Sequence, residues 1–336
     1  MNSKPQTATA VHYSIRTVIL LGISVYIAYL VETNSLQLYI GERIRPLVSA
    51  SALFMYALAV IQGFLAYRTY RGSVVECDCC STPPAKSWPR ASLLYGLIAL
   101  PLLLGFLLPD TVLGGSFASK KGIILSAVAP AYGGGPAQPA QPAQPAAMNE
   151  DTADSTESTE AADEEAGSVN NEATITSPPT EEELDQLFVA EDDFSRDLAV
   201  LAKRLYVLPM IEVRPDIYME VLSAIVSFKQ AFMGKEIEIN GFVYRESGLT
   251  DNQFVIGRIA VQCCTADATP YGVLAEYEGA PELKDDTWVK LKGTIGETEY
   301  NGNVIIKIDV SESSVIEAPD NPYIYPNFDF LNAPID

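Results

Sequence analysis

Three long apolar runs occupy the first third of the chain, at residues 11–31, 47–67 and 91–108. About 20 apolar residues in a helix cross a bilayer core about 30 Å thick, so each run predicts a membrane-spanning helix. The first run has the position of a signal peptide, but no small-residue cleavage site follows it. The third contains Pro101, which membrane helices tolerate, and its alternative is a buried helix of a soluble domain. We therefore expect residues 1–131 to form a transmembrane block.

A helical segment is predicted over residues 180–232. Thr180 and Glu183 have the spacing of a capping box, which predicts that a helix begins directly after Thr180. A second helix is expected over about residues 195–206, where three leucines share one face. A third, over about residues 216–232, is strongly apolar on one side. We expect these helices to pack on the domain that follows.

Strand-like alternation begins after the helical segment and continues through residues 233–318. Five runs are bounded by Gly, Pro, Asn or Asp, at residues 235–245, 253–262, 271–277, 287–295 and 303–310. Asn301 and Gly302 between the last two runs predict a hairpin. With Gly241 as a bend in the first, the runs predict a small five-stranded OB-like β-barrel, and a β-sandwich fragment is the alternative. The expected fold is a membrane α-helical N-terminal block plus a soluble α+β C-terminal domain.

Two segments lack such periodicity. Residues 132–179 consist of Pro-Ala-Gln triplets followed by an acidic run rich in Ser and Thr, which is typical of a disordered linker. Residues 319–336 are rich in Pro and aromatic residues, and we expect an extended tail across the barrel. The alternative is contact with a partner or the membrane surface through Tyr323, Tyr325 and Phe328.

Charge is distributed unevenly along the chain. Residues 1–132 hold ten Lys and Arg against five Asp and Glu, whereas residues 133–336 hold twelve against thirty-eight. The acidic part repels phosphate backbones, so we expect no nucleic-acid partner. The N-terminal flank and the loop between the second and third apolar runs, which would lie on one side of a membrane, carry six Lys and Arg. The first loop and the flank after the third run, on the other side, carry four. This bias predicts a multi-pass protein of the cell membrane with a cytoplasmic N-terminus and an external C-terminal domain.

Five cysteines form two clusters that are candidate sites for a soft metal ion. Cys263 and Cys264 are predicted to end the second strand, with Asp267 on the following turn, and could alternatively form a strained disulfide. Alternation along a strand predicts that one thiol points inward, and the competing interpretation is one buried apolar Cys plus an incidental thiol.

The other cluster, Cys77, Cys79 and Cys80, lies between the second and third apolar runs. A complete Zn²⁺ site needs four ligands. The competing interpretation is therefore a set of reduced or modified thiols near the membrane.

The amino-acid sequence contains no recognisable enzyme motif. His12 is the single histidine, so a Ser-His-Asp triad or a histidine-rich metal site is not expected. No phosphate-binding loop or activated nucleophile is recognisable. We expect a protein without catalytic residues or a resident cofactor.

Several short sequence motifs resemble those of an uncharacterised bacterial family whose members are described as subunits of a two-component membrane permease complex. They are Lys121-Gly122, Gly234-Lys235, GFVY at 241–244, R-x-x-V-x-CC-x-ADA at 258–268, WVKLKGTI at 288–295 and PYIYP at 322–326. The resemblance covers the membrane block and the β-domain but not the linker. It implies a non-enzymatic accessory subunit that partners a multi-span permease in the lipid bilayer. Many members of that family have a His-rich loop where this chain has Cys-Asp-Cys-Cys, so a metal-binding role of that loop is not carried over to this chain. The cysteines themselves suggest the alternative function, which is thiol-based binding and sensing of a soft metal or metalloid.

Overall fold

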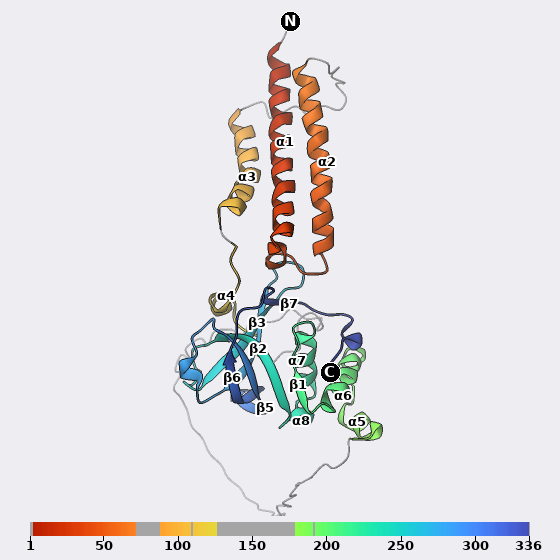
Figure 1. Cartoon of the computed structure of the whole chain (residues 1–336), viewed down its shortest axis with the longest axis vertical. Helices are drawn as coiled ribbons and strands as arrows, with labels where there is room; N and C mark the ends of the chain where they lie inside the picture. The colour runs from red at the N-terminus through yellow and green to blue at the C-terminus, as the bar shows by residue number, and fades with distance from the viewer. Residues whose placement is uncertain (1–2, 72–87, 109, 126–178, 191, 336) are drawn as a thin grey trace, which may run out of the picture.

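The computed structural model describes residues 3–71, 88–108, 110–125, 179–190 and 192–335. Helices α1 (Ser3–Glu32), α2 (Arg45–Tyr70) and α3 (Trp88–Leu107) form a bundle, and a separate head lies beyond one end of it (Figure 1). Helix α1 begins at the end of the bundle away from the head. Of the described helices, α1 from Ala10 and α2 are long and apolar enough to cross a membrane. The apolar part of α3 is shorter, at Ala91–Leu107.

Small residues bring the three helices of the bundle together. The Ser24 hydroxyl on α1 donates to the carbonyl of Ala52 on α2 over 2.9 Å. Gly22 on α1 faces the side chain of Leu102, and Gly105 on α3 faces the ring of Tyr26 so closely that a Cβ at either position would clash. Small residues and hydroxyl groups at helix contacts are typical of packing in lipid, where close backbone approach replaces the hydrophobic effect.

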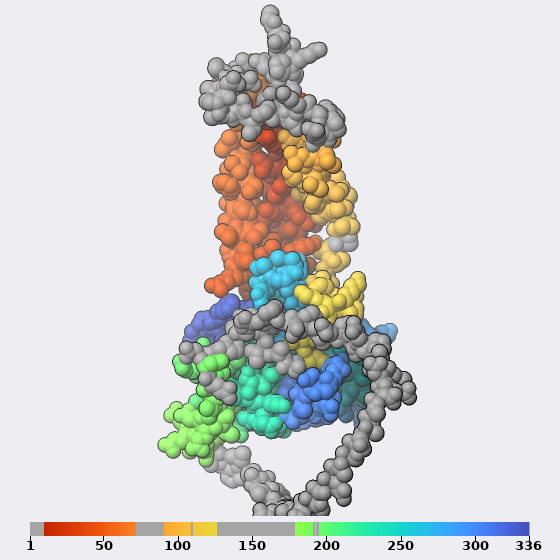
Figure 2. Space-filling model, turned by 180° about the vertical axis from the view of Figure 1, so that it is seen from behind, coloured from red at the N-terminus to blue at the C-terminus, as the bar shows by residue number. Residues whose placement is uncertain are grey.

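Most large apolar side chains of the bundle remain uncovered. Only 11% of the residues in the most apolar stretch of α1, and 6% of those in the corresponding stretch of α2, are buried. Leu53, Phe64 and Leu97 expose 76%, 58% and 68% of their surface. Figure 2 shows the bundle projecting from the head, with the sides of its helices uncovered along their length. A continuous apolar surface of this extent requires a lipid or protein environment, because water would make it an aggregation site.

The head is a mixed sheet whose hydrogen-bonded strands run in the order β1-β2-β5-β6-β4-β3-β7, and β2 also pairs with β3. The strands are β1 (Met210–Glu212), β2 (Glu236–Tyr244), β3 (Gln253–Ala260), β4 (Thr269–Glu276), β5 (Trp288–Tyr300), β6 (Asn303–Val315) and β7 (Tyr323–Ile324). Because β2 and β3 pair, the five strands β2 to β6 form a closed ring of ladders. The predicted Asn-Gly hairpin is present: Asn301 and Gly302 both have positive φ and join β5 to β6.

Two short strands, β1 and β7, extend this ring and were not expected. β1 adds in parallel to β2, and β7 adds in parallel to β3 with Tyr323 opposite Ile259. The chain therefore has seven described strands where the sequence predicts five. Each of the two is too short to show alternation, so local pattern does not reveal it.

Helices α5 (Glu181–Leu187) and α6 (Asp193–Tyr206) agree closely with the sequence, and the capping box at Thr180 and Glu183 is present. The three leucines of α6 are fully buried: Leu198, Leu201 and Leu205. The single helix expected over residues 216–232 is wrong in one respect. It is divided into α7 (Tyr218–Ser227) and α8 (Lys229–Phe232), because Phe228 adopts a non-helical φ of −120° and ψ of 36°.

One core joins these helices to the sheet, with Ile211, Val221 and Ile237 among its fully buried members. A smaller cluster on Phe242 and Val255 receives Leu125 from the segment that follows the bundle.

Glu238 on β2 carries a nearly buried carboxylate between two lysines of β5. The Lys290 ammonium donates to it over 2.6 Å, and Lys292 Nζ lies 3.4 Å away. Burial opposes ionisation of Glu238, but the hydrogen bonds and charges of the two lysines outweigh it and lower its pKa. A group whose pKa is lowered by folding stabilises the fold above its ordinary pKa and loses that contribution as the pH falls through the folded value.

We predict that the double variant Lys290→Met/Lys292→Met unfolds more easily at pH 7, by roughly 1–2 kcal/mol once the partial exposure of both lysines is allowed for. The difference from wild type should begin to shrink below about pH 4.5, the ordinary pKa of Glu, and should vanish only as the pH falls through the lower pKa of Glu238 in the folded wild type, where its carboxyl becomes protonated. Thermal unfolding of the full chain in detergent across this pH range measures it. The exposed Lys284→Met serves as a matched control. A difference that is constant with pH would contradict the assignment.

Candidate functional site

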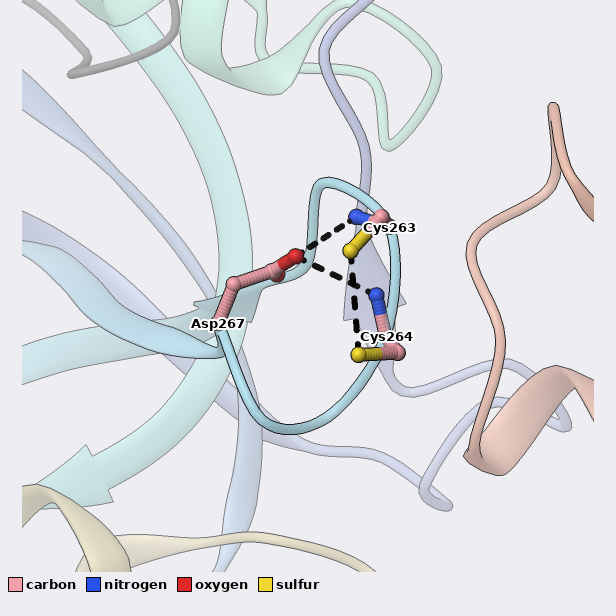
Figure 3. A group of neighbouring side chains, drawn as sticks. All are labelled: Cys263, Cys264 and Asp267. Carbon is pink, nitrogen blue, oxygen red and sulfur yellow. Dashed lines mark hydrogen bonds between the residues drawn. The ribbon is translucent and has the colours of Figure 1, made fainter.

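The thiol loop, residues 261–268, connects β3 to β4 on the side of the head that faces the bundle (Figure 3). Strand β3 ends at Ala260, so the prediction that Cys263 and Cys264 end the strand is wrong. The chain bends at Gln262 and Cys263 and returns to the ladder at Thr269. The cysteines therefore lie on a turn, where strand alternation no longer decides the direction of their side chains.

Both thiols lie outside the core. Cys263 is exposed, Cys264 is half-buried, and both are free. Their sulfur atoms are 3.7 Å apart. The expectation of one inward and one outward thiol does not hold, and neither does the competing interpretation of one buried apolar cysteine. The turn instead directs both sulfur atoms to the same side, as Figure 3 shows.

Asp267 holds the thiol loop in this shape. Its carboxylate accepts hydrogen bonds from the backbone N–H groups of Gln262 at 2.8 Å, Cys263 at 2.8 Å and Cys264 at 3.2 Å. Such a side chain-to-backbone pattern closes a turn locally and leaves few of its donors unpaired. Asp267 is thus the residue that determines where the two thiols lie.

The same carboxylate sets the protonation of its neighbours. A hydrogen bond from the Cys263 thiol to Asp267, together with one to Cys264, raises the pKa of Cys263 to about 12. Burial works against ionisation of Asp267, but the thiol and the three backbone donors lower its pKa overall. The resting loop therefore contains a protonated Cys263 thiol beside an ionised carboxylate.

The structure brings together the three residues of this candidate site, which the sequence predicts. One ligand atom from each of Cys263, Cys264 and Asp267 lies within 4.8 Å of the others. Sulfur ligands favour thiophilic ions such as Zn²⁺ or Cu⁺. The second predicted cluster, Cys77, Cys79 and Cys80, lies outside the described residues.

The connection between α1 and α2, residues 33–44, pairs with the thiol loop through its backbone. Ile40 and Cys264 form an antiparallel bridge. The Gly41 N–H donates to the Cys263 carbonyl over 2.8 Å, and the Thr265 N–H donates to the Tyr39 carbonyl over 3.0 Å. The head therefore contacts the end of the bundle directly.

A second attachment comes from residues 110–125, which follow α3. The Gly115 N–H, at the start of α4 (Gly115–Lys121), donates to Asp286 over 2.5 Å. Ile124 donates to the Pro270 carbonyl at 3.0 Å and accepts from Gly272 at 3.1 Å. This segment, which belongs to the block expected over residues 1–131, therefore packs against the head.

A groove of about 820 Å³ opens where the connection, the thiol loop and the C-terminal tail meet. Its wall includes Glu42, Arg43, Asp216, Cys263, Phe328 and Asp329. The Arg43 guanidinium lies 5.2 Å from the centre of the Phe328 ring. The sequence does not reveal this groove, because its walls come from four separate segments. The only hint of the groove in the sequence is the high content of Pro and aromatic residues in the tail, residues 319–336.

Comparison with known proteins shows to which protein family this chain is related. Two family models match the chain, the DUF1980 N-terminal domain over residues 15–124 and the DUF1980 C-terminal domain over residues 188–326. The chain belongs to the DUF1980 family. This confirms the family resemblance found in the sequence, and the unmatched stretch between the two DUF1980 domains contains the predicted linker.

Two relatives of this DUF1980 chain are informative. The Bacillus subtilis (strain 168) "UPF0703 protein YcgQ" is 21% identical over 324 residues, which covers 93% of this chain and 99% of the relative. A Streptococcus mutans protein described as "Putative two-component membrane permease complex subunit" is 28% identical over 142 residues, 41% of this chain and 51% of the relative. No solved structure matches the chain at a significant level.

We predict that Asp267→Asn makes Cys263 more reactive, because the carboxylate that raises the pKa of the thiol is lost. Alkylation by iodoacetamide at pH 8, in a chain whose only cysteine is Cys263, should accelerate by roughly tenfold for each unit by which the pKa falls. Asp251→Asn, an exposed carboxylate elsewhere in the head, should leave the rate unchanged. Equal rates in the two variants would contradict the role given to Asp267.

We also predict that Gly41→Ala loosens the contact between bundle and head, because its Cβ would lie 2.6 Å from the Gln262 carbonyl oxygen. Hydrogen exchange of the full chain in detergent should increase at residues 39–41 and 263–265. Gly96→Ala on α3, where a Cβ meets nothing within 4 Å, is the control. Unchanged exchange at both segments would show that the junction tolerates the extra atom.

Proposed function

We propose that this chain is a non-enzymatic accessory subunit of a membrane permease complex. In this proposal the bundle lies in the bilayer and the head lies at the membrane surface. The observation that carries it is the uncovered apolar surface of α1 and α2, two helices whose length and composition suit a bilayer crossing. The Streptococcus mutans relative, whose description names a permease complex, supports the choice of partner.

The third helix fits this arrangement as a shorter companion. α3 contacts α1 through Leu102 and Tyr26, and its outer face remains apolar at Leu93, Leu97 and Leu107. Tilt, bilayer thinning or a neighbouring protein accommodates an apolar stretch shorter than the membrane. A multi-span permease beside α2 and α3 would cover the side chains that no part of the described chain covers.

We further propose that the ring of five strands in the head is an OB-type barrel. Support comes from the ladder order, in which β2 pairs with both β3 and β5 while β4 pairs in parallel with β6. A five-stranded Greek-key ring of this kind is the architecture of OB barrels. In this chain the ring serves as a rigid support for the thiol loop.

Site-specific photo-crosslinking tests the partnership. A photoreactive residue at Leu53 on α2 or Leu97 on α3, both strongly exposed, should crosslink a multi-span protein in native membranes. The same residue at Glu278, exposed in a loop of the head, is the matched control for nonspecific capture. Crosslinks confined to lipid at both helix positions, with no polytopic protein after purification in mild detergent, would contradict the accessory role.

Labelling in intact cells tests the proposed orientation. In a chain without native cysteines, Glu278→Cys should react with a membrane-impermeant maleimide before lysis, because the head is proposed to be external. Restoring only Cys77 should give a chain that is labelled after lysis alone. The reverse pattern would place the head in the cytoplasm.

A further inference from the structure

We propose that Cys263, Cys264 and Asp267 bind a thiophilic, tetrahedrally coordinated divalent cation such as Zn²⁺, with the fourth coordination position open to the groove. This goes beyond the accessory role and does not depend on it. The argument rests on the distance between the sulfur atoms, the rigidity of the thiol loop and the place of the open position.

The distance between the sulfur atoms matches a tetrahedral ion. Binding converts both thiols to thiolates and releases their protons to the solvent. Two thiolates bound at about 2.3 Å and separated by the tetrahedral angle have sulfur atoms about 3.8 Å apart. The separation of Cys263 and Cys264 Sγ is 3.7 Å. A disulfide would need about 2.05 Å, and an ion held linearly at the same bond length would need about 4.6 Å. The resting geometry therefore favours a tetrahedral ion over both alternatives.

The third ligand is a carboxylate that is already in place. Asp267 accepts the backbone hydrogen bonds of Cys263 and Cys264 at Oδ2 and that of Gln262 at Oδ1, so Oδ1 keeps a lone pair for a cation. On the other side of the loop, Gly41 and Ile40 hold the backbone of both cysteines. Ligands held from two sides bind an ion without reorganising the loop, which is the usual requirement of a preformed site.

Three ligands leave one tetrahedral position free, which is the arrangement of exchangeable or catalytic sites rather than closed structural ones. Of the three ligands, Cys263 lines the groove together with Glu42, Asp216 and Asp329, so an ion would reach this site from the groove. These carboxylates and the strongly acidic C-terminal part of the chain raise the local concentration of cations. The site is therefore suited to taking up an ion from the groove and releasing it there.

The test uses the full-length protein in detergent, reduced, with Cys77, Cys79 and Cys80 changed to Ser so that the head contains the only thiols. Co²⁺ is the probe, because thiolate-bound tetrahedral Co²⁺ gives charge-transfer and visible absorption that free Co²⁺ lacks. We expect one Co²⁺ per chain, displaced by Zn²⁺. Absence of the charge-transfer band in this background protein would overturn the proposal.

Variants of the same protein identify the ligands. Cys263→Ser/Cys264→Ser should abolish the band, while Asp267→Asn should weaken binding by roughly tenfold or more. Asp251→Asn is the matched control and should bind as the background does. Far-ultraviolet circular dichroism and the melting temperature of the ion-free variants establish that each is folded. A band that persists in the folded double variant overturns the site, and unchanged affinity in Asp267→Asn overturns the assignment of the third ligand.

Discussion

Backbone hydrogen bonds between the α1–α2 connection and the thiol loop are the constraint on which the arrangement of this molecule depends. The bridge between Ile40 and Cys264 uses main-chain groups, which side-chain changes do not remove. It requires close approach, and Gly41 provides that approach by having no Cβ. Together with the pairing of Ile124 beside β4, this contact places the head directly against the end of the bundle.

The chain combines two surfaces that require different surroundings. The bundle exposes apolar side chains along α1, α2 and α3, whereas residues 133–336 carry thirty-eight acidic residues. A surface of the first kind is stable in lipid or against another apolar protein, and one of the second kind is stable in water. The junction lies at the boundary between them, and both the thiol loop and the groove are found there.

Exposed free thiols on an ordered loop are uncommon, since free cysteine is among the most buried residue types. Here hydrogen bonds from Asp267 in the head and from Gly41 at the end of the bundle hold the backbone of the loop, and the thiols lie near the surface. Any group that binds Cys263 or Cys264 therefore contacts the loop on which the α1–α2 connection docks.

The sequence by itself determined the elements whose signals are local. Apolar run length predicted α1, α2 and α3, the capping box at Thr180 predicted the start of α5, and Asn301-Gly302 predicted the hairpin between β5 and β6. Each signal depends on residues within one or two turns of one another, so short-range energetics are sufficient to encode it. The motif that contains Cys263 and Cys264 also pointed to the family and to the candidate metal ligands.

Only the tertiary structure decided the strands β1 and β7, the turn that directs both thiols to the same side, the groove, and the docking of the connection on the thiol loop. These features depend on pairs that are far apart in the chain, such as Ile40 with Cys264 and Ile259 with Tyr323. Backbone groups make these contacts, and every residue type except proline has the same donor and acceptor. Residue identity therefore carries little information about which distant segments pair, and the folded core selects the partners.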